Sequence, residues 1–176
     1  IPYMPRPEVF ILIIVLVLSS VWNLVYAVGI GLVIASLIFM KKVGDLTSES
    51  FNIFPINKGG LKLPSNLKEE VFIKDIEGPL FFGSSSNFNQ RSKEIPLTAS
   101  ILIIRLKKVP YIDQSGLYAI ESVINDLITK DKKVFLVGLN EQPKDLMEKA
   151  NIIPNLIPRE QIFNDFESSL LSIKKS

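Results

Sequence analysis

The sequence predicts a helical membrane hairpin followed by an α/β domain with a mixed central sheet and flanking helices. Three observations support this prediction. A run of 32 residues, Val9 to Met40, carries no charge. From about Leu67 onward, apolar strand candidates alternate with amphipathic helix candidates. A polar loop, Asp113 to Gly116, falls between a strand and a helix, which is where α/β folds place functional groups.

The composition excludes several classes of function. The 176 residues include no Cys and no His. Disulfides, thiolate metal sites, Cys nucleophiles, imidazole catalysis and His-ligated metals are therefore excluded, and we expect no enzyme, no catalytic residue, no metal and no cofactor. The formal net charge is +2 with interspersed signs, so no nucleic-acid partner is expected. The first residue is Ile, which we interpret as the sign of a fragment of a longer protein.

The uncharged run predicts a membrane segment. It is too long for a signal peptide and lacks a basic start, and a soluble core rarely needs such a run. One straight helix would be about 48 Å long, whereas the hydrocarbon core is about 30 Å thick. The polar interruption Ser19 to Asn23 favours two short crossings. Spacing alone does not decide between these and one tilted helix. Arg6 before the run and Lys41 and Lys42 after it favour two cytoplasmic ends.

The segments after the run divide by composition and periodicity. Gly29 and Gly31 permit close helix packing within the second half of the run. Residues 44–62 contain Pro and Gly and are predicted to be a linker. Beyond the linker, apolar runs predict strands and amphipathic spacing predicts helices. The predicted strands are 71–76, 80–82, 101–106 and 134–139, and the predicted helices are 84–94, 117–128, 144–150 and 160–173.

The loop Asp113-Gln114-Ser115-Gly116 is the strongest candidate site. Free N–H groups and the helix dipole favour negative charge at a helix start. Asp113 is suited to cap those donors, and Gly116 permits a sharp backbone turn. Ser115 then presents a hydroxyl, and its phosphorylation would add about −1.5 to −2 charges. The alternative is that Asp113 and Ser115 only cap the helix.

These residues, together with the segment Gly78-Pro79-Leu80-Phe81-Phe82-Gly83 and the order of strands and helices, resemble a STAS domain. The segment 78–83 resembles the SulP branch of anion transporters in particular. Upstream, Met4-Pro5-Arg6-Pro7, the segment 22–31 and Phe39-Met40-Lys41-Lys42 are similar to the last two membrane helices of those transporters. Family members often carry Asp where this chain has Asn23. The resemblance covers nearly the whole chain.

The resemblance implies a domain organisation and a function. Residues 1–43 would be a transmembrane hairpin in the scaffold half of a transporter, and residues 63–176 a cytoplasmic STAS domain. The protein would be a secondary active transporter of an inorganic, sulfate-like anion in the inner membrane, and its STAS tail would regulate transport through protein contacts. Ser115 falls where anti-sigma antagonists carry their phosphorylated serine, so Asp113, Ser115 and Gly116 would form a regulatory or partner surface.

The resemblance also implies partners. The transported anion would bind in upstream helices, so no substrate-binding residue lies in this fragment. Lipid, a second copy of the protein and a regulatory protein at the STAS domain are the other expected partners. A membrane-tethered STAS module with a signalling or scaffold role, and no transport, is the alternative. The identity of the anion and of the coupling ion stays open.

Four other groups are weighed as sites. Gly83 to Ser86 is read as a helix cap in preference to a phosphate cradle, because it lacks the Lys of a nucleotide-binding loop. The acidic residues Glu69, Glu70, Asp75 and Glu77 are read as a solvated face. Lys130 to Lys133 is read as a mixed-charge turn that is solvated or meets anionic lipid. Arg105 interrupts a buried strand and is expected at a sheet end or with its side chain snorkelling to the surface, and contact with a partner is the alternative.

Overall fold

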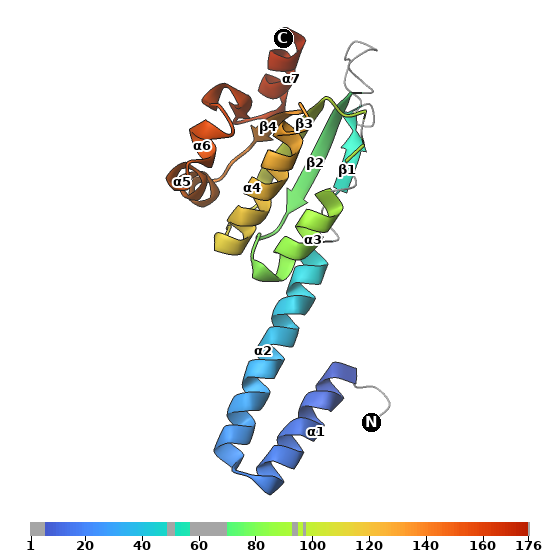
Figure 1. Cartoon of the computed structure of the whole chain (residues 1–176), viewed down its shortest axis with the longest axis vertical. Coiled ribbons are helices and arrows are strands. Elements are labelled where there is room, and N and C mark those ends of the chain that lie inside the picture. The colour runs from blue at the N-terminus through green and yellow to red at the C-terminus, as the bar shows by residue number, and fades with distance from the viewer. Residues whose placement is uncertain (1–5, 49–51, 57–69, 93–94, 97, 176) are drawn as a thin grey trace. The chain divides into compact units, whose positions relative to one another are not determined.

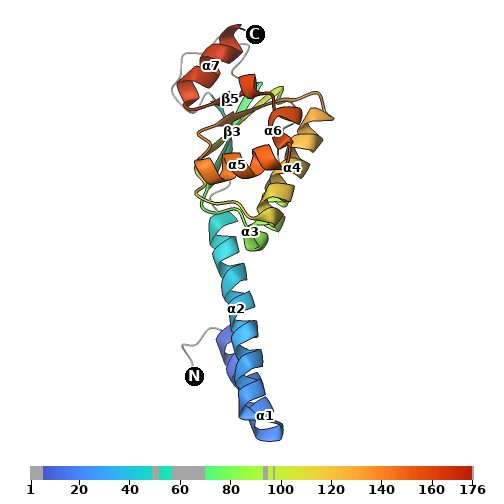
Figure 2. The ribbon, with the colours of Figure 1, turned by 90° about the vertical axis from the view of Figure 1, so that its left-hand side faces the viewer.

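The computed structural model describes residues 6–48, 52–56, 70–92, 95–96 and 98–175. It divides into two compact units, residues 1–43 and residues 44–176. The first unit is helical and the second is an α/β unit, drawn in Figures 1 and 2.

The helical unit is a hairpin of α1 (Arg6–Val21) and α2 (Leu24–Ser48), the second helix continuing into the other unit. The chain turns at Trp22 and Asn23, which confirms a break within the predicted polar interruption. Asn23 Oδ1 accepts a hydrogen bond from the backbone N of Val25 at 2.8 Å, so its side chain caps the first turn of α2. By length and composition, the stretch 24–45 suffices to cross a membrane, and residues 8–21 form a shorter apolar helix.

Small residues let the two helices of the hairpin approach closely. Ala27 and Gly31 of α2 are buried. A Cβ added at Gly31 would lie 2.3 Å from Cγ2 of Val15 in α1, whereas one added at Gly29 would meet nothing within 4 Å. Close packing is thus confirmed at Gly31 but not at Gly29. Most large apolar side chains of both helices face outward, as expected for helices surrounded by other apolar groups.

The α/β unit is built on a five-stranded mixed sheet in the order β1-β2-β3-β4-β5. Its edge strand β1 (Asn52–Pro55) pairs antiparallel with β2 (Val71–Glu77). The other neighbours, β3 (Ile101–Lys108), β4 (Lys133–Val137) and β5 (Ile162–Phe163), run parallel to β2. The predicted mixed sheet is confirmed, since one pair is antiparallel and the others are parallel. Strands β2 to β5 run parallel because helical crossovers connect each to the next.

Helices cover both faces of this sheet. Over one face lie α3 (Phe82–Ser92) and α4 (Gln114–Ile128), which stand side by side in Figure 1. Their core includes Leu80, Phe88, Leu102, Ile104, Leu117, Ile120 and Ile124. The short helices α5 (Glu141–Lys149) and α6 (Ile152–Asn155) extend this layer. On the opposite face, α7 (Phe166–Lys175) packs Leu170 and Ile173 against a second core with Ile56, Ile73, Ile103 and Phe135.

Two predicted boundaries are wrong, because these two helices begin at other residues than the sequence suggests. Residues 80–82 form no strand: Leu80 makes an isolated bridge to Ile112, and α3 begins at Phe82. The last helix starts at Phe166, preceded by a 3-10 turn, η2 (Arg159–Gln161), and by β5. Asp165 accepts hydrogen bonds from the backbone N and the hydroxyl of Ser168, both at 2.8 Å, so its carboxylate caps α7.

The predicted linker 44–62 contains regular structure. Helix α2 continues through residue 48, and β1 occupies residues 52–55. Ile56 is fully buried in the second core. Residues 57–62 lie outside the described residues. The α/β unit therefore uses chain from before residue 63, because an edge strand and a core side chain come from the segment that composition alone marks as a linker.

Candidate functional site

The predicted site lies between β3 and α4. Asp113 is the N-cap residue of α4, with φ −91° and ψ −178°. Its Oδ1 accepts a hydrogen bond from the backbone N of Gly116 at 2.8 Å. Its own backbone N donates to the carbonyl oxygen of Leu80 at 3.0 Å. The prediction that Asp113 caps the helix is confirmed, and the cap is anchored to the chain segment that precedes α3.

The same carboxylate also caps α3. Oδ2 of Asp113 accepts a hydrogen bond from the backbone N of Phe82, the first residue of α3, at 3.0 Å. The residue before that helix is Phe81, whose side chain has no acceptor. Ser84, three positions on, accepts from the backbone N of Phe81 at 3.1 Å. One half of a capping box therefore comes from within α3 and the other half from Asp113, on the next helix.

Ser84 does not occupy the position that the sequence predicts. It is fully buried inside α3, and its hydroxyl also donates to the carbonyl oxygen of Phe81 at 3.1 Å. The first two donors of this turn, Phe81 N and Phe82 N, have protein acceptors. The predicted cap at residues 84–86 is therefore corrected to a cap by Asp113 with support from Ser84. Because internal acceptors hold these donors, this turn is not an open phosphate cradle.

Gly116 is required for a different reason from the one that the sequence suggests. Its φ is not positive, so no sharp turn depends on it. A Cβ at this position would lie 2.4 Å from the carbonyl oxygen of Leu80, nearer than real Cβ atoms approach. Gly116 therefore allows the start of α4 to lie directly against the Leu80 segment.

Ser115 lies between these two anchored residues. It is half-buried at the second position of α4. Among the described residues, its hydroxyl has no hydrogen-bond partner, so Asp113 alone provides the side-chain cap. Nearby elements carry three exposed aromatic side chains, Phe82, Tyr111 and Tyr118, with 66%, 50% and 60% of their surface accessible. Exposed aromatic side chains are typical of binding surfaces.

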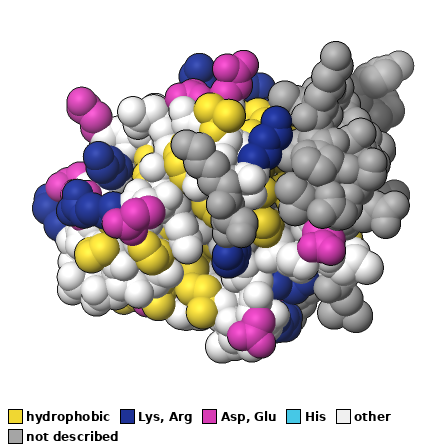
Figure 3. Space-filling view, turned by 90° about the horizontal axis from the view of Figure 1, so that it is seen from above, with side chains coloured by type: hydrophobic (Ala, Val, Ile, Leu, Met, Phe, Trp, Pro, Cys, Tyr) yellow, Lys and Arg dark blue, Asp and Glu magenta, His cyan; other side chains and the backbone are white. Residues whose placement is uncertain are grey.

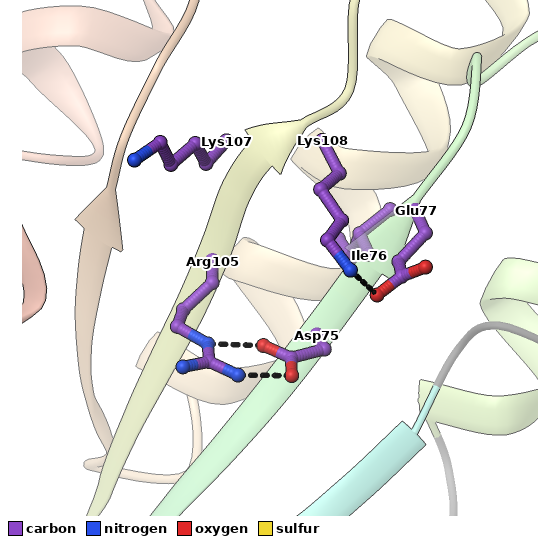
Figure 4. A pocket seen from close by; sticks show the side chains of 6 residues that line it. All are labelled: Asp75, Ile76, Glu77, Arg105, Lys107 and Lys108. Atoms are coloured by element: carbon purple, nitrogen blue, oxygen red, sulfur yellow. Dashed lines mark hydrogen bonds and ion pairs between the residues drawn. The ribbon is translucent and has the colours of Figure 1, made fainter.

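A second group of polar side chains lines a cavity of about 190 Å³ at the ends of β2 and β3 (Figure 4). Arg105 donates two hydrogen bonds to the carboxylate of Asp75, and Lys108 pairs with Glu77. The Arg105 guanidinium also lies 5.9 Å from the Phe54 ring and 5.4 Å from the Phe166 ring. Of the predicted solvated face, Glu70 is exposed, whereas Asp75 and Glu77 are half-buried and paired with cations; Glu69 lies outside the described residues.

Arg105 therefore joins strands and a helix. The hydrogen bond to Asp75 raises the pKa of Arg105, against the opposing effect of burial. Its ring contacts reach β1 and α7, so one side chain links four elements. Arg105 pairs with Val137, the last residue of β4, so its place fits the expected sheet end, and its guanidinium is held there by Asp75. Sequence patterns gave no signal for its partner, because the register that places Asp75 opposite Arg105 is set by the whole sheet.

The predicted mixed-charge turn after α4 is partly internal. Lys132 is 8% exposed, and its ammonium donates to the carbonyl oxygens of Pro96 and Ala99. Lys130 pairs with Asp126 one helical turn earlier. Elsewhere, basic and acidic side chains are interspersed on the face shown in Figure 3. Within the described ranges, no group of three or more His, Cys, Asp or Glu residues is arranged to hold a metal ion.

Comparison with known proteins identifies the class. The STAS domain model matches residues 64–169. The chain therefore belongs to the STAS domain family. This match starts after β1, although β1 and Ile56 complete the sheet and the core of this unit.

The relatives are named as transporters. The chain is 28% identical over 145 residues to the Bacillus subtilis protein named "Putative sulfate transporter YvdB". The match covers 81% of this chain and 26% of that protein. It is 25% identical over 163 residues to the bicarbonate transporter BicA of Synechocystis. That match covers 89% of this chain and 28% of the relative. The chain thus spans about a quarter of the length of the curated relatives it matches. The resemblance to the C-terminal part of SulP-type transporters is confirmed.

A solved structure has the same fold over nearly the whole chain. The murine Solute Carrier 26 family member A9 anion transporter, in its inward-facing state, matches with a TM-score of 0.66 and 15% identity. The match covers 98% of this chain and 29% of that one. At this identity the likeness concerns the fold alone.

Proposed function

We propose that this chain is the C-terminal part of a secondary active transporter of an inorganic, sulfate-like anion. The hairpin would supply the last two membrane helices, in the scaffold half, and the α/β unit would be a cytoplasmic tail. The observation that carries this proposal is continuity: similarity to relatives named as sulfate and bicarbonate transporters covers 81% and 89% of the chain, more than the STAS domain alone.

The chemistry of the chain supports a role without catalysis. The chain contains neither His nor Cys, and the carboxylates near the cavity are engaged with Arg105 and Lys108. We assign no anion-binding residue here, because the transported anion would bind in membrane helices upstream of this segment. One relative is named as a sulfate transporter and the other as a bicarbonate transporter, which supports an inorganic anion as the transported class and leaves its identity open.

The second part of the proposal concerns regulation. Asp113, Ser115 and Gly116 would form a surface through which the tail controls transport by contact with a regulatory protein. The support is local: a half-buried hydroxyl at a helix start, to which no described residue is hydrogen-bonded, next to exposed aromatic side chains. The working protein would be a homodimer in the inner membrane, with the α/β unit on the cytoplasmic side.

Transport itself is the test of this proposal. The full-length protein would be reconstituted in liposomes, and uptake of labelled sulfate and bicarbonate would be measured against protein-free liposomes. Saturable uptake of either anion is expected. If neither anion, nor a wider set of inorganic anions and dicarboxylates, enters under proton or sodium gradients, the transporter proposal fails. A membrane-tethered STAS module that binds partners would then be the better account.

A further inference from the structure

We infer that Asp113 transmits a change of charge at Ser115 to helix α3. This inference deepens the regulatory part of the proposed function and names the structural element that would respond. It starts from one observation: the two oxygens of a single carboxylate hold the first turns of two helices, through Gly116 N at 2.8 Å and Phe82 N at 3.0 Å.

The two helices depend on this carboxylate to different degrees. The start of α4 is also held by Gly116 against Leu80 and by the bond from Asp113 N to the Leu80 carbonyl. The start of α3 has no N-cap side chain of its own, since Phe81 occupies that position, and the Ser84 hydroxyl holds only Phe81 N and not Phe82 N. Loss of the Asp113 carboxylate from Phe82 N would therefore loosen α3 more than α4.

Ser115 is placed to disturb this arrangement. It lies two residues after Asp113, in the first turn of α4, and no described residue binds its hydroxyl. A phosphate or carboxylate there would repel the Asp113 carboxylate and compete for the same N–H donors at the start of α4. The competition would release Oδ1 from Gly116 N, and the repulsion, acting on the carboxylate so freed, favours withdrawal of Oδ2 from Phe82 N.

The response would stay confined to the beginning of α3. Phe88, two turns further along, is fully buried in the core and holds the rest of the helix. The altered surface would include Phe82, whose side chain is already 66% exposed. A negative charge at Ser115 would thus change the conformation of an aromatic side chain on the neighbouring helix without unfolding the domain.

Amide hydrogen exchange of the whole 176-residue chain in detergent tests this inference. Ser115→Asp should raise the exchange rate of the first turn of α3 by about tenfold or more, because a charge-assisted hydrogen bond is lost there. Exchange in β3 should stay unchanged. Ser115→Asn supplies a neutral side chain of similar size, and Ser122→Asp places the same charge on the exposed middle of α4. Both controls should behave like the wild type at α3.

The role of Asp113 is tested by a double variant. Asp113→Asn removes the charge that Ser115→Asp repels, so adding Ser115→Asp to it should change α3 exchange by less than twofold. The inference is overturned if Ser115→Asp leaves α3 protection unchanged. It is equally overturned if exchange in α3 and β3 rises together, or if the two substitutions add fully. Because no transport is measured, these outcomes are independent of whether the transporter proposal holds.

Discussion

Asp113 and Phe82 lie 31 positions apart in the chain, and a 3.0 Å hydrogen bond joins the carboxylate of one to the backbone N of the other. This bond makes the start of α3 depend on a residue of the following helix. Since Asp113 also caps α4, one side chain fixes the relative position of both helices over the sheet. The loop that carries Ser115 is thereby part of the structural frame of the domain.

Asp113→Ala should destabilise the α/β unit by about 2–3 kcal/mol, because two helix starts lose an acceptor at roughly 1 kcal/mol each and both donors lose their partner. Asp113→Asn keeps one acceptor and should cost about half as much. Urea unfolding of residues 44–176 measures both values. The matched control is Asp126→Ala, which removes an exposed pair with Lys130 and should cost about 0.5 kcal/mol or less. Equal costs for positions 113 and 126 would contradict the double cap.

A fragment of residues 44–176 should fold in buffer without detergent and unfold cooperatively. The shorter fragment 63–176, which composition alone suggests, should be less stable by about 3–5 kcal/mol. It lacks β1 and the fully buried Ile56, and it exposes the edge of β2. Ile56→Ala in the longer fragment should account for about 2–4 kcal/mol of this loss. Comparable urea midpoints for the two fragments would show that β1 contributes little.

The cap at α7 should make stability depend on pH. Hydrogen bonds from the backbone N and hydroxyl of Ser168 lower the pKa of Asp165 below its ordinary value. A lowered folded-state pKa means that the stabilisation is present at neutral pH and is lost as pH falls through the folded pKa. Asp165→Ala should therefore have a lower urea midpoint than the wild type at pH 7, and the difference should shrink below about pH 4.

Asp165→Asn is the control for that titration, because an Asn side chain still accepts a hydrogen bond at an N-cap but does not ionise. Its stability relative to Asp165→Ala should hardly change between pH 7 and about pH 3. A difference between wild type and Asp165→Ala that is constant with pH would contradict the assigned cause.

Positions 6 and 41 should be labelled from the same side of the membrane. Measured from the turn at Trp22 and Asn23, α1 is about 24 Å long and α2 reaches residue 41 after about 27 Å, so the two positions lie at similar depth in the hairpin. Single-cysteine variants are suitable because the chain has no native Cys. A cysteine at position 22 should be labelled from the other side. Labelling of positions 6 and 41 from opposite sides would exclude the hairpin topology.

The sequence predicted those elements whose pattern is local. The strands β2, β3 and β4 appear as apolar runs, and α4 appears through the spacing of Leu117, Ile120 and Ile124. The cap at Asp113 was also predictable, because acceptor and donor lie three residues apart. In each case the residues that form the element are close together in the chain.

Three of the missed features depend on distant residues. The start of α3 is set by Asp113, so the serines at 84–86 suggested a cap too far along the chain. Strand β1 has four residues and is a strand because β2 lies beside it. The pairing of Asp75 with Arg105 follows from sheet register. No local pattern carries this information, since all three depend on segments that meet only in the folded chain.

The regulatory role of Ser115 is the central claim, and anion uptake by the full-length protein tests it most directly. Initial rates of uptake would be compared across substrate concentration for wild type, Ser115→Asp, Ser115→Asn and Ser122→Asp, at equal protein in the membrane. Ser115→Asp should change the maximal rate by at least about threefold while the apparent KM stays near that of the wild type, because the proposed anion site would lie in membrane helices upstream of this segment. Ser122→Asp should behave like the wild type. Unchanged maximal rate in Ser115→Asp, or an equal change in Ser122→Asp, would contradict this account.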